Sequence, residues 1–114
     1  MNHPHCVYIA SPWRAATPEA RRVHAAYVQA CVADSLSRNE APLAPHLHYS
    51  AILDDSDPAQ RAQGMAAGQA WMPVADLLAL YVDLGESEGM CAEWAAAQVI
   101  GLRIERRSLE GWAK

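Results

Sequence analysis

Residues 76–101 read DLLALYVDLGESEGMCAEWAAAQVIG, and this stretch decides the fold. The segment 76–82 is almost continuously apolar, which is typical of a strand covered on both faces, as in a parallel sheet. A short loop follows, and the alanine-rich segment from about Gly89 to Ile100 predicts a helix that ends at Gly101. A buried strand followed by a helix indicates an α/β protein.

The rest of the chain repeats this alternation. The predicted strands are residues 6–11, 42–45 and 102–106, and the predicted helices run from Pro18 to about Arg38 and from Pro58 to about Met72. Residues 46–57 are predicted to form a long loop. We therefore expect a single domain, 1–114, with a three-layer, Rossmann- or flavodoxin-like parallel sheet of four to five strands and helices on both faces.

Composition excludes several classes of protein. The chain has 114 residues, of which 52% are hydrophobic and 19% charged, and this balance argues against disorder. Its net charge of -4 argues against binding to a nucleic acid polymer, which needs a basic surface. No apolar run is long enough for a membrane span, and the N-terminus does not resemble a signal peptide. Three widely spaced cysteines, Cys6, Cys31 and Cys91, indicate reduced structural thiols in apolar surroundings and a cytoplasmic protein.

Three predicted loops follow the strands: residues 11–16, 45–57 and 83–89. In a parallel sheet such loops meet at the carboxyl ends of the strands, where ligands bind at the switch in strand order. Most of the polar residues that could carry chemistry lie in or beside these loops. We expect them to line one cleft.

Glu93 and Ser87 stand at the start of the predicted helix after residues 83–89. Glu93 is either a first-turn glutamate that favours the positive end of the helix or a partly desolvated carboxylate that acts as a nucleophile. Ser87 is either a helix cap or part of an anion site with the free amides near Gly89, and the two roles can coexist.

The first strand and its loop supply Tyr8, Trp13 and Arg14. A buried tyrosine usually packs and satisfies its hydroxyl with one partner, and a loop arginine usually reaches solvent. An arginine at the carboxyl end of a parallel strand is nevertheless well placed to bind phosphate or carboxylate. Trp13 either stacks on a base or covers the edge of the sheet.

The long loop and the chain end contain further polar residues. His46 and His48 alternate, so they would point the same way in extended chain, but no third metal ligand is evident. Asp54, Asp55 and Asp57 form either a solvated turn with a helix cap or a source of a general acid. The pair at 106–107, Arg-Arg, is expected to be a solvated strand end.

Three segments together carry a resemblance to a known family: VYIASPWR at 7–14, PLAPHLHYSAILDD at 42–55, and the quoted stretch 76–101. With them the chain resembles the nucleoside 2-deoxyribosyltransferase superfamily, in particular its small phage and bacterial members. The most specific element is Ser87-x-Gly89-Met90-x-x-Glu93, which opens the helix that carries the nucleophile of that family.

The resemblance implies roles for individual residues. Glu93 would attack the sugar C1′, Tyr8 would orient that carboxylate, and Arg14 and Ser87 would bind a 5′-phosphate, as in the nucleotide N-hydrolase branch. The transferase branch typically has an aspartate in place of Ser87, which would repel a phosphate, so the chain is expected to favour 5′-monophosphates. The further substrate-binding residues are expected to be Trp13, His46, Gly89 and Met90.

Two departures from the family pattern stand out. The branch carries an aspartate that protonates the leaving base, and the nearest match here is Arg61, so Asp55, or its neighbours Asp54 and Asp57, would have to supply the acid. A serine of the first loop is replaced by Pro12. The expected function is thus an N-glycosidic bond hydrolase or a deoxyribosyltransferase that acts on a nucleoside or nucleotide.

Two other functions stay open from the sequence: a non-catalytic nucleotide-binding module of the same fold, and a structural protein. No cofactor or metal is expected. The family is typically oligomeric, so we expect a homodimer or a higher homo-oligomer.

Overall fold

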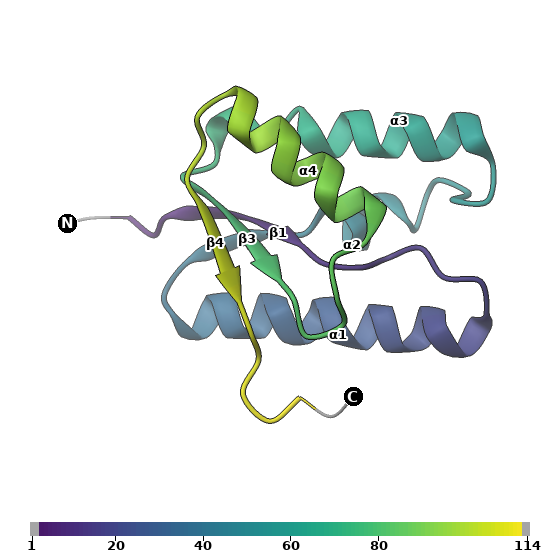
Figure 1. Ribbon diagram of the computed structural model, residues 1–114, viewed down its shortest axis with the longest axis horizontal. Coiled ribbons are helices and arrows are strands. Elements are labelled where there is room, and N and C mark those ends of the chain that lie inside the picture. Colours follow the sequence, from purple (N-terminus) through teal and green to yellow (C-terminus); the bar gives the residue numbers. More distant parts are fainter. Residues whose placement is uncertain (1–2, 113–114) are drawn as a thin grey trace.

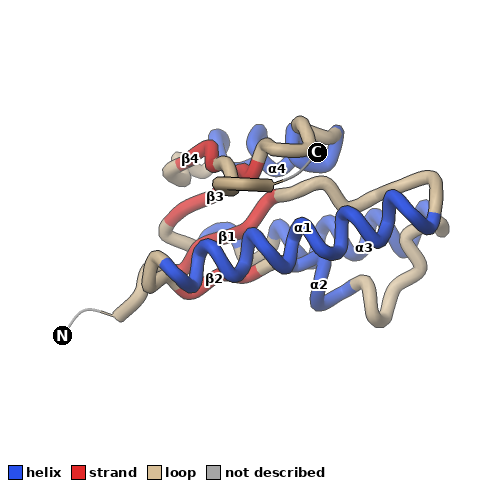
Figure 2. Tube along the Cα trace, turned by 90° about the horizontal axis from the view of Figure 1, so that it is seen from below, coloured by secondary structure: helices blue, strands red, loops and turns tan. Residues whose placement is uncertain are grey.

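The computed structural model describes residues 3–112. In chain order the elements are β1 (Cys6–Ala10), α1 (Pro18–Ser37), β2 (Ala41–Leu43), α2 (Pro45–Tyr49), α3 (Pro58–Gln69), a 3₁₀ turn (Met72–Val74), β3 (Leu77–Tyr81), α4 (Glu88–Val99) and β4 (Ile104–Arg107). The four strands form one parallel sheet in the order β2-β1-β3-β4, seen edge to edge in Figure 2. The predicted α/β class, parallel sheet and strand number are confirmed.

The strand order reverses between β1 and β3. The chain leaves β1 for β2 on one side and returns to place β3 on the other, with Tyr8 beside both Leu43 and Leu78. The switch point of the sheet therefore lies at the carboxyl ends of β1 and β3, where parallel sheets bind their ligands.

Helices cover both faces of the sheet, with α1 on one side and α3 and α4 on the other (Figure 1). Alternate residues of β1 point to opposite faces, so Val7 and Ile9 pack with α1 while Tyr8 and Ala10 pack toward α4. All five residues of β3 are buried, which explains its unbroken apolar sequence. The sheet thus separates two cores.

Side-chain caps begin the three long helices. Thr17, Asp57 and Ser87 each accept a hydrogen bond from a backbone N–H of the first turn of α1, α3 and α4. Proline at the first position of α1 and α3 fixes the backbone where no amide partner is needed.

The predicted loop 46–57 is partly wrong. Its first residues form the short helix α2, which begins at Pro45 and packs against α3. Proline again favours a first helical position, but five residues give too short a period to be detected from sequence. The helix after Pro58 also ends earlier than expected, at Gln69, before the 3₁₀ turn.

The expected solvated strand end at 106–107 is wrong for Arg107. Its guanidinium is buried and donates hydrogen bonds to both carboxylate oxygens of Glu40 at 2.7 Å, to Glu105 at 2.8 Å and to the Tyr81 hydroxyl at 3.2 Å. Arg106, by contrast, is exposed and pairs with Glu86 at 3.3 Å. Arg107 therefore ties β4 to the segment before β2 across the α1 face.

The three cysteines differ in solvent exposure. All three are free, but only Cys31 is buried, and burial raises the pKa of its thiol to about 12. Cys6 and Cys91 are exposed, so the expected apolar surroundings hold for Cys31 alone. Within residues 3–112, no helix combines the length and apolar character that a membrane crossing requires.

A carboxylate clamp holds the segment after β4 on the α1 face. Asp83 accepts hydrogen bonds from the Tyr27 hydroxyl at 2.6 Å, the Ser108 hydroxyl at 2.6 Å and the Leu109 N–H at 2.9 Å. Trp112 then packs edge-on against Tyr27, with ring centroids 5.0 Å apart. Residues 108–112 therefore pack against the α1 face of the protein.

Candidate functional site

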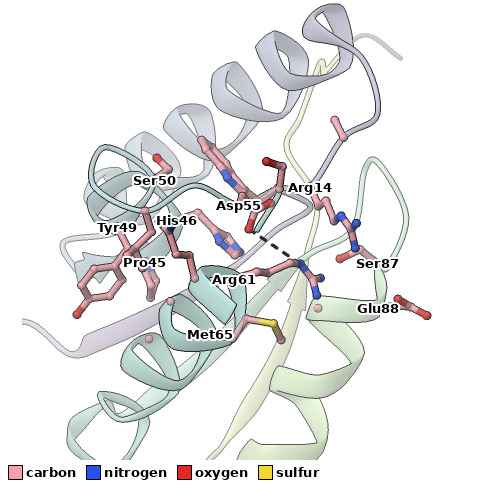
Figure 3. Close-up of a pocket in the computed structure, with 18 of the residues that line it drawn as sticks. Arg14, Pro45, His46, Tyr49, Ser50, Asp55, Arg61, Met65, Ser87 and Glu88 are labelled. Atoms are coloured by element: carbon pink, nitrogen blue, oxygen red, sulfur yellow. Dashed lines mark ion pairs between the residues drawn. The ribbon is translucent and has the colours of Figure 1, made fainter. Parts of the chain in front are cut away.

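A cavity of about 880 Å³ opens at the carboxyl ends of β1 and β3, at the switch point of the sheet. Its walls come from the β1–α1 loop, α2 and the residues after it, α3, and the first turns of α4 (Figure 3). The polar and aromatic residues that line it include Tyr8, Trp13, Arg14, Arg21, His46, Tyr49, Asp54, Asp55, Gln60, Arg61, Gln69, Ser87, Glu88 and Glu93. The three predicted loops thus contribute to one cavity, as expected.

Glu93 is the buried acid of this cavity. Its side chain lies on the inner face of α4 and its residue is only 5% exposed. Among residues 3–112, its Oε1 has no hydrogen-bond partner. Burial raises the pKa of the carboxyl to about 7, although a hydrogen bond with the Tyr8 hydroxyl lowers it. A buried carboxylate oxygen without a partner calls for an explanation, and a ligand in the cavity would supply one.

Tyr8 lies beside Glu93, on the central strand β1. Burial raises the pKa of its phenol, and the charge of Glu93 and the hydrogen bond between the two groups raise it further. Tyr8 therefore stays protonated, so toward the Glu93 carboxylate its hydroxyl acts as a donor. The side chains predicted to be neighbours are neighbours.

Gly68 of α3 makes room for the Tyr8 hydroxyl. A Cβ at this position would lie 3.1 Å from that hydroxyl oxygen and 3.0 Å from the Cβ of Pro45. Gly68 was not among the residues predicted from the sequence. The signal for it is a pair of glycines four residues apart, Gly64 and Gly68, inside a helix, where glycine costs stability unless another group approaches closely.

Hydrogen-bond donors line the cavity wall at the N-terminus of α4. The Ser87 hydroxyl accepts the N–H of Met90 at 3.3 Å, so its own proton stays free to donate into the cavity. Arg14 reaches toward Ser87 from the β1–α1 loop (Figure 3), and among residues 3–112 it has no ion-pair partner. Gly89 lines the same wall. Ser87 therefore caps the helix and lines the cavity at once.

Met90 is placed differently from the other expected binding residues. Its side chain is 1% exposed and packs in the core beneath α4, and its N–H is taken by Ser87. It does not line the cavity, so its contribution is to anchor α4 against the sheet.

The acidic residues after α2 have separate roles. Asp57 caps α3, and Asp54 accepts from Ser56, whose hydrogen bonds lower the pKa of its carboxyl. Asp55 lies in the cavity wall, where Arg61 of α3 is its ion-pair partner at 3.9 Å (dashed line in Figure 3). Of the three, Asp55 is the one paired with a cation at the cavity.

Trp13 and His46 form an aromatic pair in the cavity wall. Their rings are almost parallel, at 7°, with centroids 5.7 Å apart. Burial lowers the pKa of His46 to about 4, so the imidazole is neutral at neutral pH. Because both lie on the helix α2, His46 and His48 do not point the same way: His48 packs against Tyr49 instead. No cluster of three metal-ligating side chains occurs within residues 3–112.

Tyr49, Arg21 and Gln69 also line the cavity and were not predicted from the sequence. Tyr49 accepts a hydrogen bond from the Trp71 indole at 3.0 Å, and its proximity to Tyr8 contributes to the raised pKa of that phenol. These residues come from helices whose cavity-facing sides depend on packing, which the sequence does not display.

Comparison with known proteins identifies the family. A family model described as a domain of unknown function, DUF7768, matches residues 5–107, and the chain belongs to this family. A comparison with curated proteins finds no match.

A solved structure shares the fold. It belongs to a 2-deoxyribosyltransferase of the psychrotolerant bacterium Bacillus psychrosaccharolyticus, and it matches with a TM-score of 0.64 at 16% sequence identity. The match covers 96% of this chain and 76% of that one. The chain therefore has a nucleoside 2-deoxyribosyltransferase-like fold.

Proposed function

We propose that the protein cleaves the N-glycosidic bond of nucleosides or nucleotides, with Glu93 as nucleophile and a preference for 5′-monophosphates. One observation carries the proposal: the buried carboxylate of Glu93 lies in the same cavity as the Arg14 guanidinium and the Ser87 hydroxyl at a helix start, and within residues 3–112 neither Glu93 Oε1 nor Arg14 has a partner. The shared fold with a 2-deoxyribosyltransferase is consistent with this chemistry.

The chemistry proceeds in two displacements. Glu93 attacks C1′ through an oxocarbenium-like transition state and forms a covalent glycosyl ester while the C1′–N bond to the base breaks. Water then hydrolyses the ester, or a second base accepts the sugar. Tyr8 donates to the carboxylate and holds it in place. The pKa of Glu93, about 7, means that the nucleophilic form is well populated only from neutral pH upward.

Ser87, Gly89 and Arg14 bind the 5′-phosphate in this scheme. The hydroxyl and the guanidinium are donors, and the N-terminus of α4 favours negative charge. Trp13 and His46 offer a flat apolar surface for the base.

A second function, nucleotide binding without turnover, is favoured by one specific observation. Asp55, the acid expected to protonate the leaving base, is engaged with the Arg61 guanidinium. If Asp55 faces Arg61 rather than the leaving base, bases that need protonation to leave would bind without being cleaved.

The test is release of free base from a panel of deoxynucleoside monophosphates and the matching nucleosides, measured by chromatography. We expect base release from the monophosphates, and a slowly hydrolysed 2-fluoro sugar analogue should add the mass of the sugar phosphate to a peptide containing Glu93. Tight nucleotide binding without free base or adduct would favour the binding module. Absence of both nucleotide binding and base release would refute both functions.

A further inference from the structure

Arg61 lines the same part of the cavity wall as Arg14, although the two come from different elements. Arg61 lies on α3 and Arg14 in the β1–α1 loop, and both guanidinium groups reach the wall near Ser87 (Figure 3). Both side chains also border a smaller adjoining cavity of about 180 Å³. Two positive groups around one small space repel each other unless an anion lies between them.

Asp55 is the only carboxylate among the described residues that pairs with either arginine. The pair is loose: its closest atoms are 3.9 Å apart, the side chains are 27% and 40% exposed, and no hydrogen bond joins them. An exposed ion pair at this distance contributes little to stability.

The Arg107 network shows what a structural arginine looks like in this protein. Arg107 is 3% exposed at its side chain and donates to Glu40 and Glu105 at 2.7 to 2.8 Å. Arg61 has neither the burial nor the hydrogen bonds of such a group. Its position at the cavity therefore calls for a different explanation.

We propose that Arg61 is the second cation of the phosphate-binding end of the cavity and that Asp55 is its resident counter-ion, which a bound phosphate displaces. The inference rests on the proposed 5′-phosphate site. Two guanidinium groups match a phosphate dianion better than one, because each offers paired donors. Asp55 competes with the ligand for Arg61, so Asp55 limits phosphate affinity.

The test measures binding rather than turnover. Inorganic phosphate and ribose 5-phosphate are titrated into the protein by calorimetry at fixed pH and ionic strength, for the wild type, Arg61→Gln, Asp55→Asn and the double variant. Arg22→Gln is the matched control, because Arg22 lies on the exposed face of α1 and pairs with Glu19. Circular dichroism melts confirm that each variant is folded.

We expect Arg61→Gln to weaken ribose 5-phosphate binding at least tenfold, and Asp55→Asn to tighten it several-fold. In the double variant the gain from Asp55→Asn should vanish, because Arg61 is the group that Asp55 restrains. Arg22→Gln should change nothing. Unchanged affinity in Arg61→Gln, weaker binding in Asp55→Asn, or no binding by the wild type would each overturn the proposal.

The outcomes also separate this inference from the proposed function. Phosphate binding with the expected variant pattern but no release of base would refute the enzymatic function and support the proposed roles of Arg61 and Asp55. Base release that favours monophosphates over nucleosides to the same degree in the wild type and in Arg61→Gln would support the proposed function and refute the role of Arg61.

Discussion

Each face of the sheet carries a tyrosine beside a carboxylate, and the two pairs have opposite surroundings. On the α1 face, Asp83 accepts three hydrogen bonds and ties Tyr27 to the C-terminal tail. On the α4 face, Glu93 is more deeply buried, contacts Tyr8 and leaves Oε1 unpaired.

The pKa values of the two acids follow from these surroundings. Burial raises the pKa of Asp83, but hydrogen bonds from Ser108 and Tyr27 outweigh it and the net shift is downward. Burial raises the pKa of Glu93 to about 7, and the single hydrogen bond from Tyr8 does not offset it. A carboxylate whose oxygens are all hydrogen-bonded stabilises the fold. A carboxylate in a cavity that lacks such partners is a candidate for a functional role.

Of the substitutions that test this difference between Glu93 and Asp83, the largest expected effect is on catalysis. Glu93→Gln should lower kcat for base release by at least about a thousandfold, since it removes the nucleophile. Asp83→Asn should leave kcat within about threefold of the wild type, because Asp83 does not line the cavity. Steady-state assays at pH 8 on folded samples measure both. Equal losses in the two variants would show that Glu93 has only a structural role.

The free energy of unfolding should change in opposite directions in Glu93→Gln and Asp83→Asn. A rise in the pKa of Glu93 from an ordinary 4.5 to about 7 costs about 3 kcal/mol at pH 8, since folding must bury a charge. Below pH 4.5, where Glu93 is protonated in both the folded and the unfolded state, this cost is absent. The corresponding stability of the folded protein is lost as the pH rises from 4.5 to about 7. Glu93→Gln should therefore raise the free energy of unfolding at pH 8 by up to about 3 kcal/mol and by little at pH 5.

Asp83→Asn is the matched control for this experiment. The lowered pKa of Asp83 means that its stabilising contribution is present above about pH 4 and disappears only at lower pH. The variant should lose about 2 kcal/mol throughout pH 5 to 8, as charge-assisted hydrogen bonds are removed. Urea unfolding at several pH values measures both, and a pH-independent effect of Glu93→Gln would contradict the assigned burial.

Much of the fold could be predicted because strong signals lie in short segments. The apolar run 76–82 indicated a buried strand, and Ser87 was a candidate cap for the helix that follows, where α4 begins. The helix α2 was missed because five residues show no period. Arg107 was misjudged because its partner Glu40 is distant in sequence, and burial of a charge depends on a partner that local pattern cannot reveal.

The candidate site was predictable where residues follow strands. Topology brings the ends of β1 and β3 together, so Arg14, Ser87 and Glu93 were expected to lie near one cavity. The residues that line the cavity from the faces of helices were harder to predict from the sequence. Tyr49 and Gly68 line the cavity only because α2 and α3 pack as they do, and neither residue type alone signals a site.

A smaller effect should come from the glycine that makes room for the Glu93–Tyr8 pair. Gly68→Ala places a Cβ 3.0 Å from Pro45 and 3.1 Å from the Tyr8 hydroxyl, so we expect a loss of about 2 kcal/mol and at least about a tenfold lower kcat. Gly64→Ala is the control, since its Cβ meets only the flexible end of Leu53 at 3.2 Å. If both variants behaved alike, the space beside Tyr8 would carry no functional weight.

The smallest effects come from removing each tyrosine hydroxyl. Tyr27→Phe removes a donor to Asp83 and an acceptor for the Asp83 N–H at 2.9 Å, and should cost about 1 to 2 kcal/mol without moving the pH profile of activity. Tyr8→Phe removes the hydrogen bond that lowers the pKa of Glu93, so the acidic limb of the kcat/KM profile should move to higher pH. Because a merely structural tyrosine would change stability but not the profile, a Tyr8→Phe enzyme with an unmoved acidic limb would mean that the hydroxyl does not act on the nucleophile.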